Sequence, residues 1–415
     1  MRVRVPRLSA LADYDALTLT ALIWFLAKFL RYAFPPLFPT YQAAFGASNA
    51  ALGAAFTAMM TVYALMQFPS GAVADRLGAT KVIAAGAVTA AVGALALFPA
   101  VGDDVVVVPV VGDVAAGFVA LVAGMLLVGV GTGAHKTVAV GLLSRIYPTR
   151  TGRALGVLDT FGAFGGVVAP AAVTVAVATG WADWHTLFLA GGVAGLALVA
   201  AFLLRVPNRV SDTDRGGGDG GVSAAAYVRL FRRPAFSAFV AVTLCFSFAY
   251  NGAVAFLPLY LTDSAGLPDA TASLLYSALF VVNPVQLVTG DLSDRVGRLP
   301  VVGATLTLAA CGLGALLAVG AAGPAVLGAA VVAFGLGSHG FRPVRGAYLA
   351  AVIPDEVAGS GLGAVRTLLM GAGAVAPAVV GVVADAVGFG AAFGVLALAL
   401  VAAAALTGVV ALLES

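Results

Sequence analysis

The sequence predicts an all-α integral membrane protein with twelve transmembrane helices in two six-helix bundles. The 415-residue chain is 61% hydrophobic and 10% charged, with a mean hydropathy of +1.04, whereas soluble domains average about 25% charged residues. Continuous apolar runs of about 20 residues separate the charges, which is the length that a helix needs to cross a bilayer. Because these runs do not alternate with polar residues, they indicate helices rather than the strands of a closed barrel.

Twelve spans follow from the apolar runs. They are expected at roughly residues 16–38, 48–71, 82–101, 115–146, 154–178, 185–205, 236–261, 270–290, 299–319, 325–352, 360–384 and 389–411. The run Val105–Val111 is compatible with a short extracellular excursion and with the end of a helix. The first span is expected to be retained, because the basic N-terminus is not followed by a small-residue cleavage site.

Basic residues are distributed unevenly among the loops. Of the 22 Lys and Arg, sixteen fall at the N-terminus, in the loops after even-numbered spans or in the long central loop, and six fall inside spans. The other loops hold none of them, and carry instead Asp103, Asp104, Asp183, Asp263 and Asp269. The positive-inside rule therefore predicts that both termini lie in the cytoplasm, in a multi-pass protein of the cell (cytoplasmic) membrane.

One polar stretch divides the chain into related halves. Residues 206–235 include a glycine-rich segment and are expected to form a flexible cytoplasmic linker. The linker separates an N-terminal six-helix bundle, residues 1–205, from a C-terminal one, residues 236–415. At an offset of 219 or 206–207 the two halves align Pro39 with Pro258, Tyr41 with Tyr260, Gln67 with Gln286, Gly131 with Gly337, Lys136 with Arg342, Pro148 with Pro354, Asp159 with Arg366 and Pro170 with Pro377.

A charged loop occurs at equivalent positions in both halves. The two copies consist of Gly71, Asp75, Arg76, Gly78 and Lys81 after span 2, and of Gly290, Asp294, Arg295 and Gly297 after span 8. This duplicated segment resembles the loop 2–3 signature of the major facilitator superfamily, and the resemblance covers essentially the whole chain. It implies a secondary transporter whose two bundles give alternating access to a small-molecule substrate, with no catalytic residue and no cofactor. It also implies that the loop latches the outward-facing state, with its aspartate at the N-terminus of a neighbouring helix.

Two departures from the family's pattern leave the coupling mode open. The arginine that the family carries early in span 4 is absent, and the sequence there reads Gly129 to Lys136. The glycine–proline motif of antiporters in span 5 is matched only partly by the segment from Gly162 to Pro170. Symport and antiport therefore both remain possible, with H⁺ or Na⁺ as the coupling ion.

The spans contain an excess of positive charge. They hold one carboxylate, Asp159, and six cations, namely Lys28, Arg31, Lys136, Arg342, Arg345 and Arg366. Each charge inside a membrane costs at least ~2.5 kcal/mol even on insertion scales. The excess therefore predicts a compensating ligand, and a small organic or inorganic anion is the simplest one.

The substrate site is expected on spans 1, 4, 7 and 10, which the resemblance implies line a central cavity. Arg31, Lys136 and Arg342 are predicted to hold the anion, because guanidinium grips carboxylate bidentately and ammonium acts as a point charge. Tyr250, at the repeat position of Arg31, and its neighbour Asn251 are predicted to orient the anion by hydrogen bonds. Lys28 shares a face with Arg31 and is assigned to the site, although its ammonium could also snorkel.

Other polar residues of the spans are assigned to gating and proton coupling. Arg366 is expected to contact the Asp75 loop, and Asp159 to contact Arg295 or Arg298 or else to pair with Lys136. A histidine side chain ordinarily titrates near neutrality, so His135 and His339 are, with Asp159, the candidates for carrying a coupling proton.

Several other functions are weighed against transport of an anion. A drug or multidrug efflux antiporter is the alternative within transport, and a non-transporting sensor or scaffold is the alternative outside it. An enzyme is not expected, because no nucleophile–base constellation, metal-ligand spacing or phosphate loop is found. The dinucleotide-like segment Gly335–Gly340 lies inside an apolar span, so helix packing explains it. Nucleic acid is not an expected partner, the lipid bilayer is, and the chain is expected to be a monomer.

Overall fold

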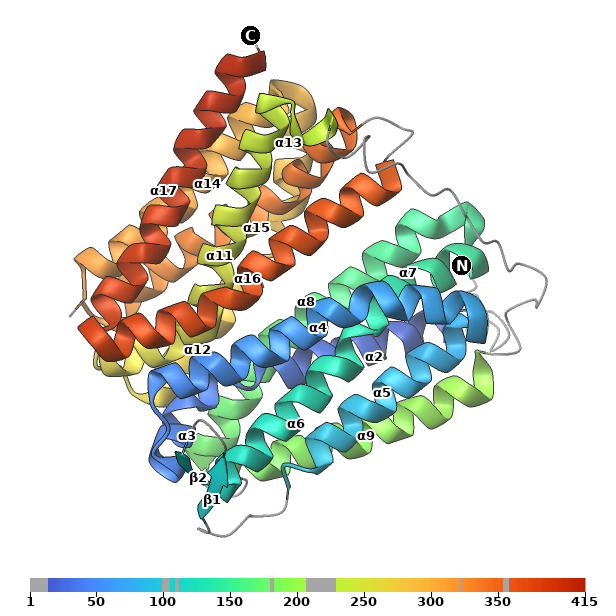
Figure 1. Cartoon of the computed structure of the whole chain (residues 1–415), viewed down its shortest axis with the longest axis vertical. Coiled ribbons are helices and arrows are strands. Elements are labelled where there is room, and N and C mark those ends of the chain that lie inside the picture. The colour runs from blue at the N-terminus through green and yellow to red at the C-terminus, as the bar shows by residue number, and fades with distance from the viewer. Residues whose placement is uncertain are drawn as a thin grey trace, which may run out of the picture. The chain divides into compact units, whose positions relative to one another are not determined.

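The computed structural model of the chain is shown in Figure 1. It describes residues 14–98, 105–108, 112–179, 183–206, 229–320, 322–353 and 358–414. These residues fall into two compact units. Unit 1 comprises Met1–Phe34 and Val62–Gly218, and unit 2 comprises Pro35–Thr61 and Asp219–Ser415.

The helices of the first half of the chain follow the predicted order. They are α2 (Asp15–Tyr32), η1 (Pro35–Leu37), α3 (Phe38–Phe45), α4 (Asn49–Leu77), α5 (Ala79–Leu95), α6 (Ala116–Gly133), α7 (His135–Ile146), η2 (Pro148–Arg150), α8 (Thr151–Thr179) and α9 (Trp184–Arg205). The second half contains α11 (Pro234–Asp263), α12 (Asp269–Val281), α13 (Val285–Val296), α14 (Arg298–Ala318), α15 (Pro324–Val352), α16 (Ala358–Val387) and α17 (Phe389–Glu414).

Every predicted span has a helical counterpart, and three spans are broken. The first is interrupted at Pro35 and Pro36, the fourth at Ala134 and the eighth at Pro284. Proline removes a backbone donor and clashes with the preceding turn, which explains the first and third breaks. Among the described residues, eleven helical segments are long and apolar enough to cross a membrane, and α5 is a shorter apolar helix of 17 residues.

The run of valines after α5 is resolved as a hairpin. Strands β1 (Val105–Val108) and β2 (Gly112–Ala115) pair antiparallel, with Val105 opposite Ala115 and Val108 opposite Gly112. The ambiguous segment is thus an excursion between two spans rather than the end of a helix. This hairpin is the one departure from an all-helical fold in the described part of the chain.

Matching glycines show that the internal repeat extends to helix packing. A Cβ on Gly131 would lie 2.3 Å from the Gly86 oxygen and 2.4 Å from the Ala90 nitrogen. A Cβ on Gly337, its repeat partner, would lie 2.4 Å from the Thr305 oxygen and 2.4 Å from the Ala309 nitrogen. The pairs Gly86 and Thr305, and Ala90 and Ala309, are themselves related by the offset of 219. Small residues let membrane helices approach closely, and both halves use them at the same crossing.

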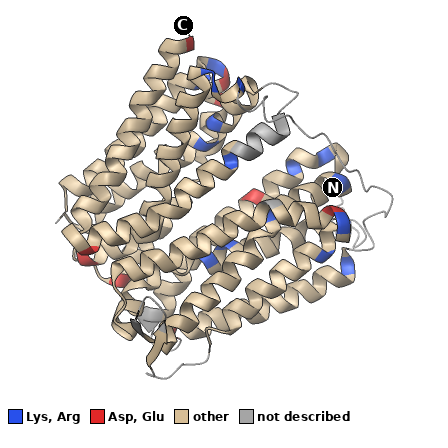
Figure 2. Cartoon of the chain, viewed as in Figure 1, with Lys and Arg blue, Asp and Glu red and all other residues tan. Residues whose placement is uncertain are grey.

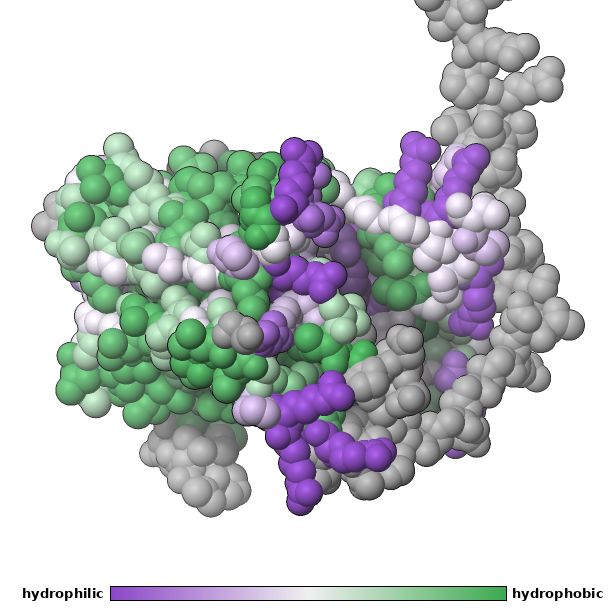
Figure 3. All heavy atoms as spheres, turned by 90° about the horizontal axis from the view of Figure 1, so that it is seen from above, coloured by the Kyte–Doolittle hydropathy of each residue, from purple (hydrophilic) through white to green (hydrophobic). Residues whose placement is uncertain are grey.

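The surface agrees with a lipid environment. Large apolar side chains such as Leu204, Leu287 and Leu412 are exposed on the helices, and hydrophobic residues cover much of the face seen in Figure 3. Lys and Arg gather toward one end of the helices in each unit, with a few at positions within the helices (Figure 2).

The segment Pro35–Thr61 packs in unit 2, although it precedes the linker by more than a hundred residues. Asp385 near the end of α16 accepts hydrogen bonds from the backbone N–H groups of Asn49 (3.1 Å) and Ala50 (2.7 Å) and from the Asn49 amide (2.8 Å). Phe38 contacts Phe256 edge to face, with ring centres 5.3 Å apart. Capping and ring contacts therefore bind this segment to helices of the second half of the chain.

Candidate functional site

Three basic side chains of unit 1 surround one indole ring. The Lys28 Nζ, the Arg31 Cζ and the Lys136 Nζ each lie 5.6 Å from the centre of the Trp24 ring. A cation within about 6 Å of an aromatic centre is attracted by the ring quadrupole. These residues and Asp159, which pairs with Lys136, are called the Trp24 cluster below.

Local sequence explains how the cluster forms. Lys28 follows Trp24 by one turn of α2 and Arg31 follows it by two, so all three side chains share a face of the helix. Gly162 of α8 makes room for the indole, since a Cβ there would lie only 2.2 Å from the Trp24 Nε1. Gly165 similarly lets α8 approach the backbone of α2, with the Phe25 oxygen 2.3 Å from its would-be Cβ.

Arg31 is buried between two aromatic rings. Its Cζ lies 3.9 Å from the centre of the Tyr63 ring, and its Nε donates to the Ala27 carbonyl at 3.4 Å. The side chain is 5% exposed. Stacking engages the faces of a guanidinium, while the N–H donors lie along its edge and suit a carboxylate or another planar anion.

The two lysines of the cluster are held differently. The Lys28 Nζ donates to the Tyr32 hydroxyl at 3.3 Å and lies 4.8 Å from the centre of that ring. The Lys136 Nζ of α7 forms an ion pair with the Asp159 carboxylate of α8. The cluster thus brings three cations and the carboxylate of Asp159 together within the apolar spans.

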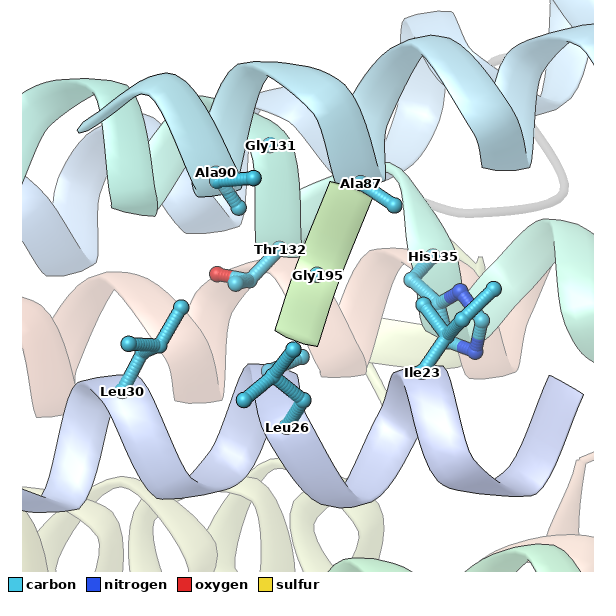
Figure 4. A pocket seen from close by; sticks show the side chains of 11 residues that line it. Ile23, Leu26, Leu30, Ala87, Ala90, Gly131, Thr132, His135 and Gly195 are labelled. Carbon is cyan, nitrogen blue, oxygen red and sulfur yellow. The ribbon is translucent and has the colours of Figure 1, made fainter. Parts of the chain in front are cut away.

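A small pocket is lined by residues of α2, α5, α6 and α7, among them His135, whose ring stacks on Trp24 (Figure 4). It measures about 20 Å³, and its lining includes Ile23 and Leu30 of α2, Ala90 of α5, Thr132 of α6 and His135 of α7. A space of this size holds one water molecule at most. It is therefore not the space that a solute occupies.

Two of the predicted residues of unit 2 contact each other. The Arg342 Cζ lies 4.3 Å from the centre of the Tyr250 ring. The Asn251 amide donates to the Ser247 carbonyl at 2.8 Å, and Gly373 faces both side chains, because a Cβ there would lie 2.5 Å from the Asn251 Nδ2 and 2.7 Å from the Ser247 Oγ. Arg342 and Tyr250 thus contact each other, whereas the Asn251 amide donates to its own helix.

Both candidate coupling histidines are buried. The His135 Nε2 lies 3.1 Å from the Thr20 carbonyl, and its ring stacks on Trp24 with the two ring planes 11° apart. Because a carbonyl oxygen only accepts, the Nε2–H donates to Thr20. The His339 ring lies edge-on to Tyr250, with ring centres 6.0 Å apart.

The duplicated loop adopts the same turn in both copies. Gly78 between α4 and α5 has φ 94°, and Gly297 between α13 and α14 has φ 96°, a conformation that glycine adopts without strain. The charged side chains at these turns, Asp75, Arg76, Lys81, Asp294 and Arg295, are exposed, and Arg295 pairs with Asp291 at 2.8 Å. Gly71 and Gly290 lie one to two turns before the ends of their helices.

The remaining intramembrane charges are also placed. Arg366 is exposed on α16, and the Arg345 Cζ lies 5.7 Å from the centre of the Phe341 ring. For Asp159, the structure selects Lys136 from the partners considered in the sequence. No group of three or more metal-ligating side chains occurs among the described residues.

The sequence did not indicate that Tyr32 contacts Lys28 or that Tyr63 contacts Arg31. It also did not indicate that Trp24 contacts three cations. Tyr32 stands four residues after Lys28, so its spacing on the helix could have indicated the contact. Tyr63 lies on a different span, and its distance from Arg31 in sequence gives no such signal.

A sequence profile identifies the family to which the chain belongs. The sequence profile of the Major Facilitator Superfamily matches residues 20–285 and 284–414, so the chain belongs to this family. It is a multi-pass transporter of the cell membrane rather than an enzyme.

A curated relative carries more specific information. The chain is 28% identical over 292 residues to the probable sulfoacetate transporter SauU of Cupriavidus necator. The match covers 66% of this chain and 63% of that protein, so the chain spans less than two thirds of the relative's length.

Solved structures confirm the fold. A bacterial homolog of the human lysosomal transporter Spinster, in an inward-facing and occupied conformation, matches with a TM-score of 0.76 at 17% identity, over 99% of this chain and 98% of that one. The xylose transporter XylE of E. coli matches with a TM-score of 0.75 at 14% identity, over 95% of each chain. At these identities the likeness concerns the fold alone.

Proposed function

We propose that the chain is a secondary active transporter of a small organic anion. The observation that carries the proposal is the Trp24 cluster, in which three cations gather around one indole. Gathering like charges inside a membrane is costly, so a bound anion stabilises this arrangement. A site for cationic drugs would need the opposite sign of charge.

The curated relative supports the same substrate class. Sulfoacetate carries a carboxylate and a sulfonate, and a protein named as its probable transporter is 28% identical to this chain. Arg31, Lys136 and Lys28 are the proposed anion ligands of unit 1. Arg342, with Tyr250 and Asn251, is the proposed contribution of unit 2.

We also propose how transport is coupled and gated. Transport proceeds by alternating access of a monomer and is coupled to H⁺ or Na⁺, with His135, His339 and Asp159 as the proton-carrying candidates. The loops around Asp75 and Asp294, together with Arg366, control the cytoplasmic gate, and both termini are cytoplasmic. The bundle boundaries at residues 205 and 236 remain a prediction.

The test is uptake and binding by the purified protein in liposomes. The panel contains sulfoacetate, malonate, acetate, inorganic phosphate, a neutral sugar and a cationic drug. Anions are expected to raise the melting temperature and to be taken up, and Arg31→Gln is expected to lower both responses. Arg205→Gln, at the exposed end of α9, is the control and is expected to behave as wild type. Uptake of only the sugar or the drug would contradict the proposal.

A further inference from the structure

A second pocket of unit 1 opens beside the first turns of α2 and α8. It measures about 280 Å³, and its lining includes Tyr14 and Leu17 at the start of α2 and Arg153, Ala154 and Val157 of α8. Leu17 and Ala154 are buried, whereas Tyr14 and Arg153 are exposed. The pocket therefore has an apolar floor and a polar rim that faces its surroundings.

The rim of this pocket is basic and aromatic. The Tyr14 and Tyr147 rings stack with their centres 6.2 Å apart and their planes at 9°. The Arg150 Nη1 donates to the Tyr14 hydroxyl at 2.8 Å, and the Leu17 N–H donates to the Tyr147 hydroxyl at 3.3 Å. Within the described part of the lining, Arg150 and Arg153 are present and no carboxylate is. The rim thus presents two guanidinium groups, which bind phosphate through their N–H edges.

The rim lies at the basic end of the unit 1 helices. Tyr14 precedes Trp24 by ten residues, which places the rim about 15 Å along α2 from the Trp24 cluster. Lys and Arg gather toward this end of unit 1 (Figure 2). Tyrosine and basic residues at the end of an apolar helix are typical of the membrane–water interface. The rim is therefore at the depth of lipid headgroups.

An apolar stripe on α8 continues from the pocket toward the middle of the helix. Val157 and Phe161 line the pocket, and Phe164 and Val168 follow on the same side of α8 at intervals of three and four residues. Phe164 is 56% exposed and Val168 is 39% exposed. Asp159 is two residues from both Val157 and Phe161, so it points about 160° away from them around the helix. The pocket and the stripe therefore lie on another side of α8 from the ion pair of the Trp24 cluster.

We propose that this pocket binds an anionic phospholipid, with its phosphate against Arg150 and Arg153 and one acyl chain along the stripe from Val157 to Val168. Basic pockets between membrane helices suit anionic headgroups, and the two arginines complement the charge of a phosphodiester. The exposed stripe suits an acyl chain, which a free anion lacks. The site is separate from the proposed anion site and does not depend on which solute is transported.

The experiment titrates the purified full chain in detergent with phosphatidylglycerol and follows the melting temperature, which a ligand of the folded state raises. Arg153→Gln is expected to weaken the apparent affinity about fivefold and Arg150→Gln/Arg153→Gln about 25-fold, since each basic residue near a lipid surface contributes a factor of this size. Arg153→Gln leaves the hydrogen bond from Arg150 to Tyr14 intact, so it tests the site even where the double variant is unstable. An unchanged affinity in Arg153→Gln overturns the proposal.

Arg145→Gln is the matched control, because it removes the same charge from the exposed end of α7, outside the described lining. It is expected to bind phosphatidylglycerol as wild type does, and an equal loss of affinity would indicate diffuse attraction and overturn the site. Phosphatidylcholine and inorganic phosphate at the same concentrations are expected to raise the melting temperature less. An equal response to phosphatidylcholine would mean that the arginines do not select the headgroup, and an equal response to phosphate would mean that the pocket binds a free anion. Either result overturns the proposal.

Discussion

The two units carry different residues at equivalent positions of the internal repeat. In unit 1, repeat positions on α2 and α7 carry two cations, Arg31 and Lys136, and both contact Trp24. In unit 2, the equivalent positions carry Tyr250 and Arg342, so the cation has its own aromatic partner at 4.3 Å. Duplication therefore preserved the scaffold while the charge diverged. Both units hold cations against aromatic rings, which stabilises these cations in part, but unit 1 gathers three of them around a single indole.

The largest expected effect comes from the cations themselves. We expect Arg31→Gln to lower anion uptake about 100-fold and Arg342→Gln about tenfold, because a hydrogen bond to a charged group contributes about 1.5–3 kcal/mol and Arg31 is the more deeply buried of the two residues. Initial rates of uptake into liposomes at equal protein density measure both. A larger loss of anion uptake in Arg342→Gln than in Arg31→Gln would contradict this prediction.

An intermediate effect is expected from the glycines that face each group. Gly162→Ala would drive a Cβ into the Trp24 indole, and Gly373→Ala would drive one into Asn251 and Ser247. The indole is large and wedged among cations, so Gly162→Ala is expected to destabilise the protein by about 1–3 kcal/mol and to impair anion binding. Gly373→Ala is expected to weaken anion binding less than Gly162→Ala does.

Thermal unfolding and calorimetric titration measure these two responses separately. Gly152→Ala, at a position where a Cβ would meet no atom within 4 Å, is the control for adding a methyl group to α8. Equal losses of anion affinity in Gly162→Ala and Gly373→Ala would contradict the difference between the units.

The smallest effect is expected from the two carboxylates that cap helices. Asp385 caps α4 from α16, whereas Asp183 caps its own helix α9 by accepting from the Thr186 N–H at 3.0 Å. Asp385→Ala is expected to cost about 1–2 kcal/mol and Asp183→Ala about 1 kcal/mol or less, because Asp385 also ties two distant helices together. Melting temperatures in detergent measure both, and a larger shift for Asp183→Ala would contradict this order.

The Asp183 carboxylate that caps α9 is expected to become protonated only at a pH below the ordinary range for an aspartate. Burial alone would raise the pKa of Asp183, but hydrogen bonds from His185 and Thr186 outweigh burial and hold that pKa below its ordinary value. A carboxyl whose pKa is lowered on folding stabilises the protein above its unfolded pKa, and this contribution is lost as the pH falls through the folded pKa. The difference in melting temperature between wild type and Asp183→Ala is therefore expected to be constant near neutral pH and to shrink in acid.

The spans, the repeat, the duplicated loop and the cations within the membrane could all be predicted from the sequence. Apolar length, loop charge and helical spacing are local properties of the chain, so Lys28 and Arg31 could be placed on one face of a helix without a structure. Contacts between side chains of different helices could not be predicted in this way. Tyr63 stacks on Arg31, and Asp159 pairs with Lys136 rather than with Arg295 or Arg298. These contacts depend on the rotation and close approach of neighbouring helices, which glycines such as Gly162 permit and which no spacing along the chain encodes.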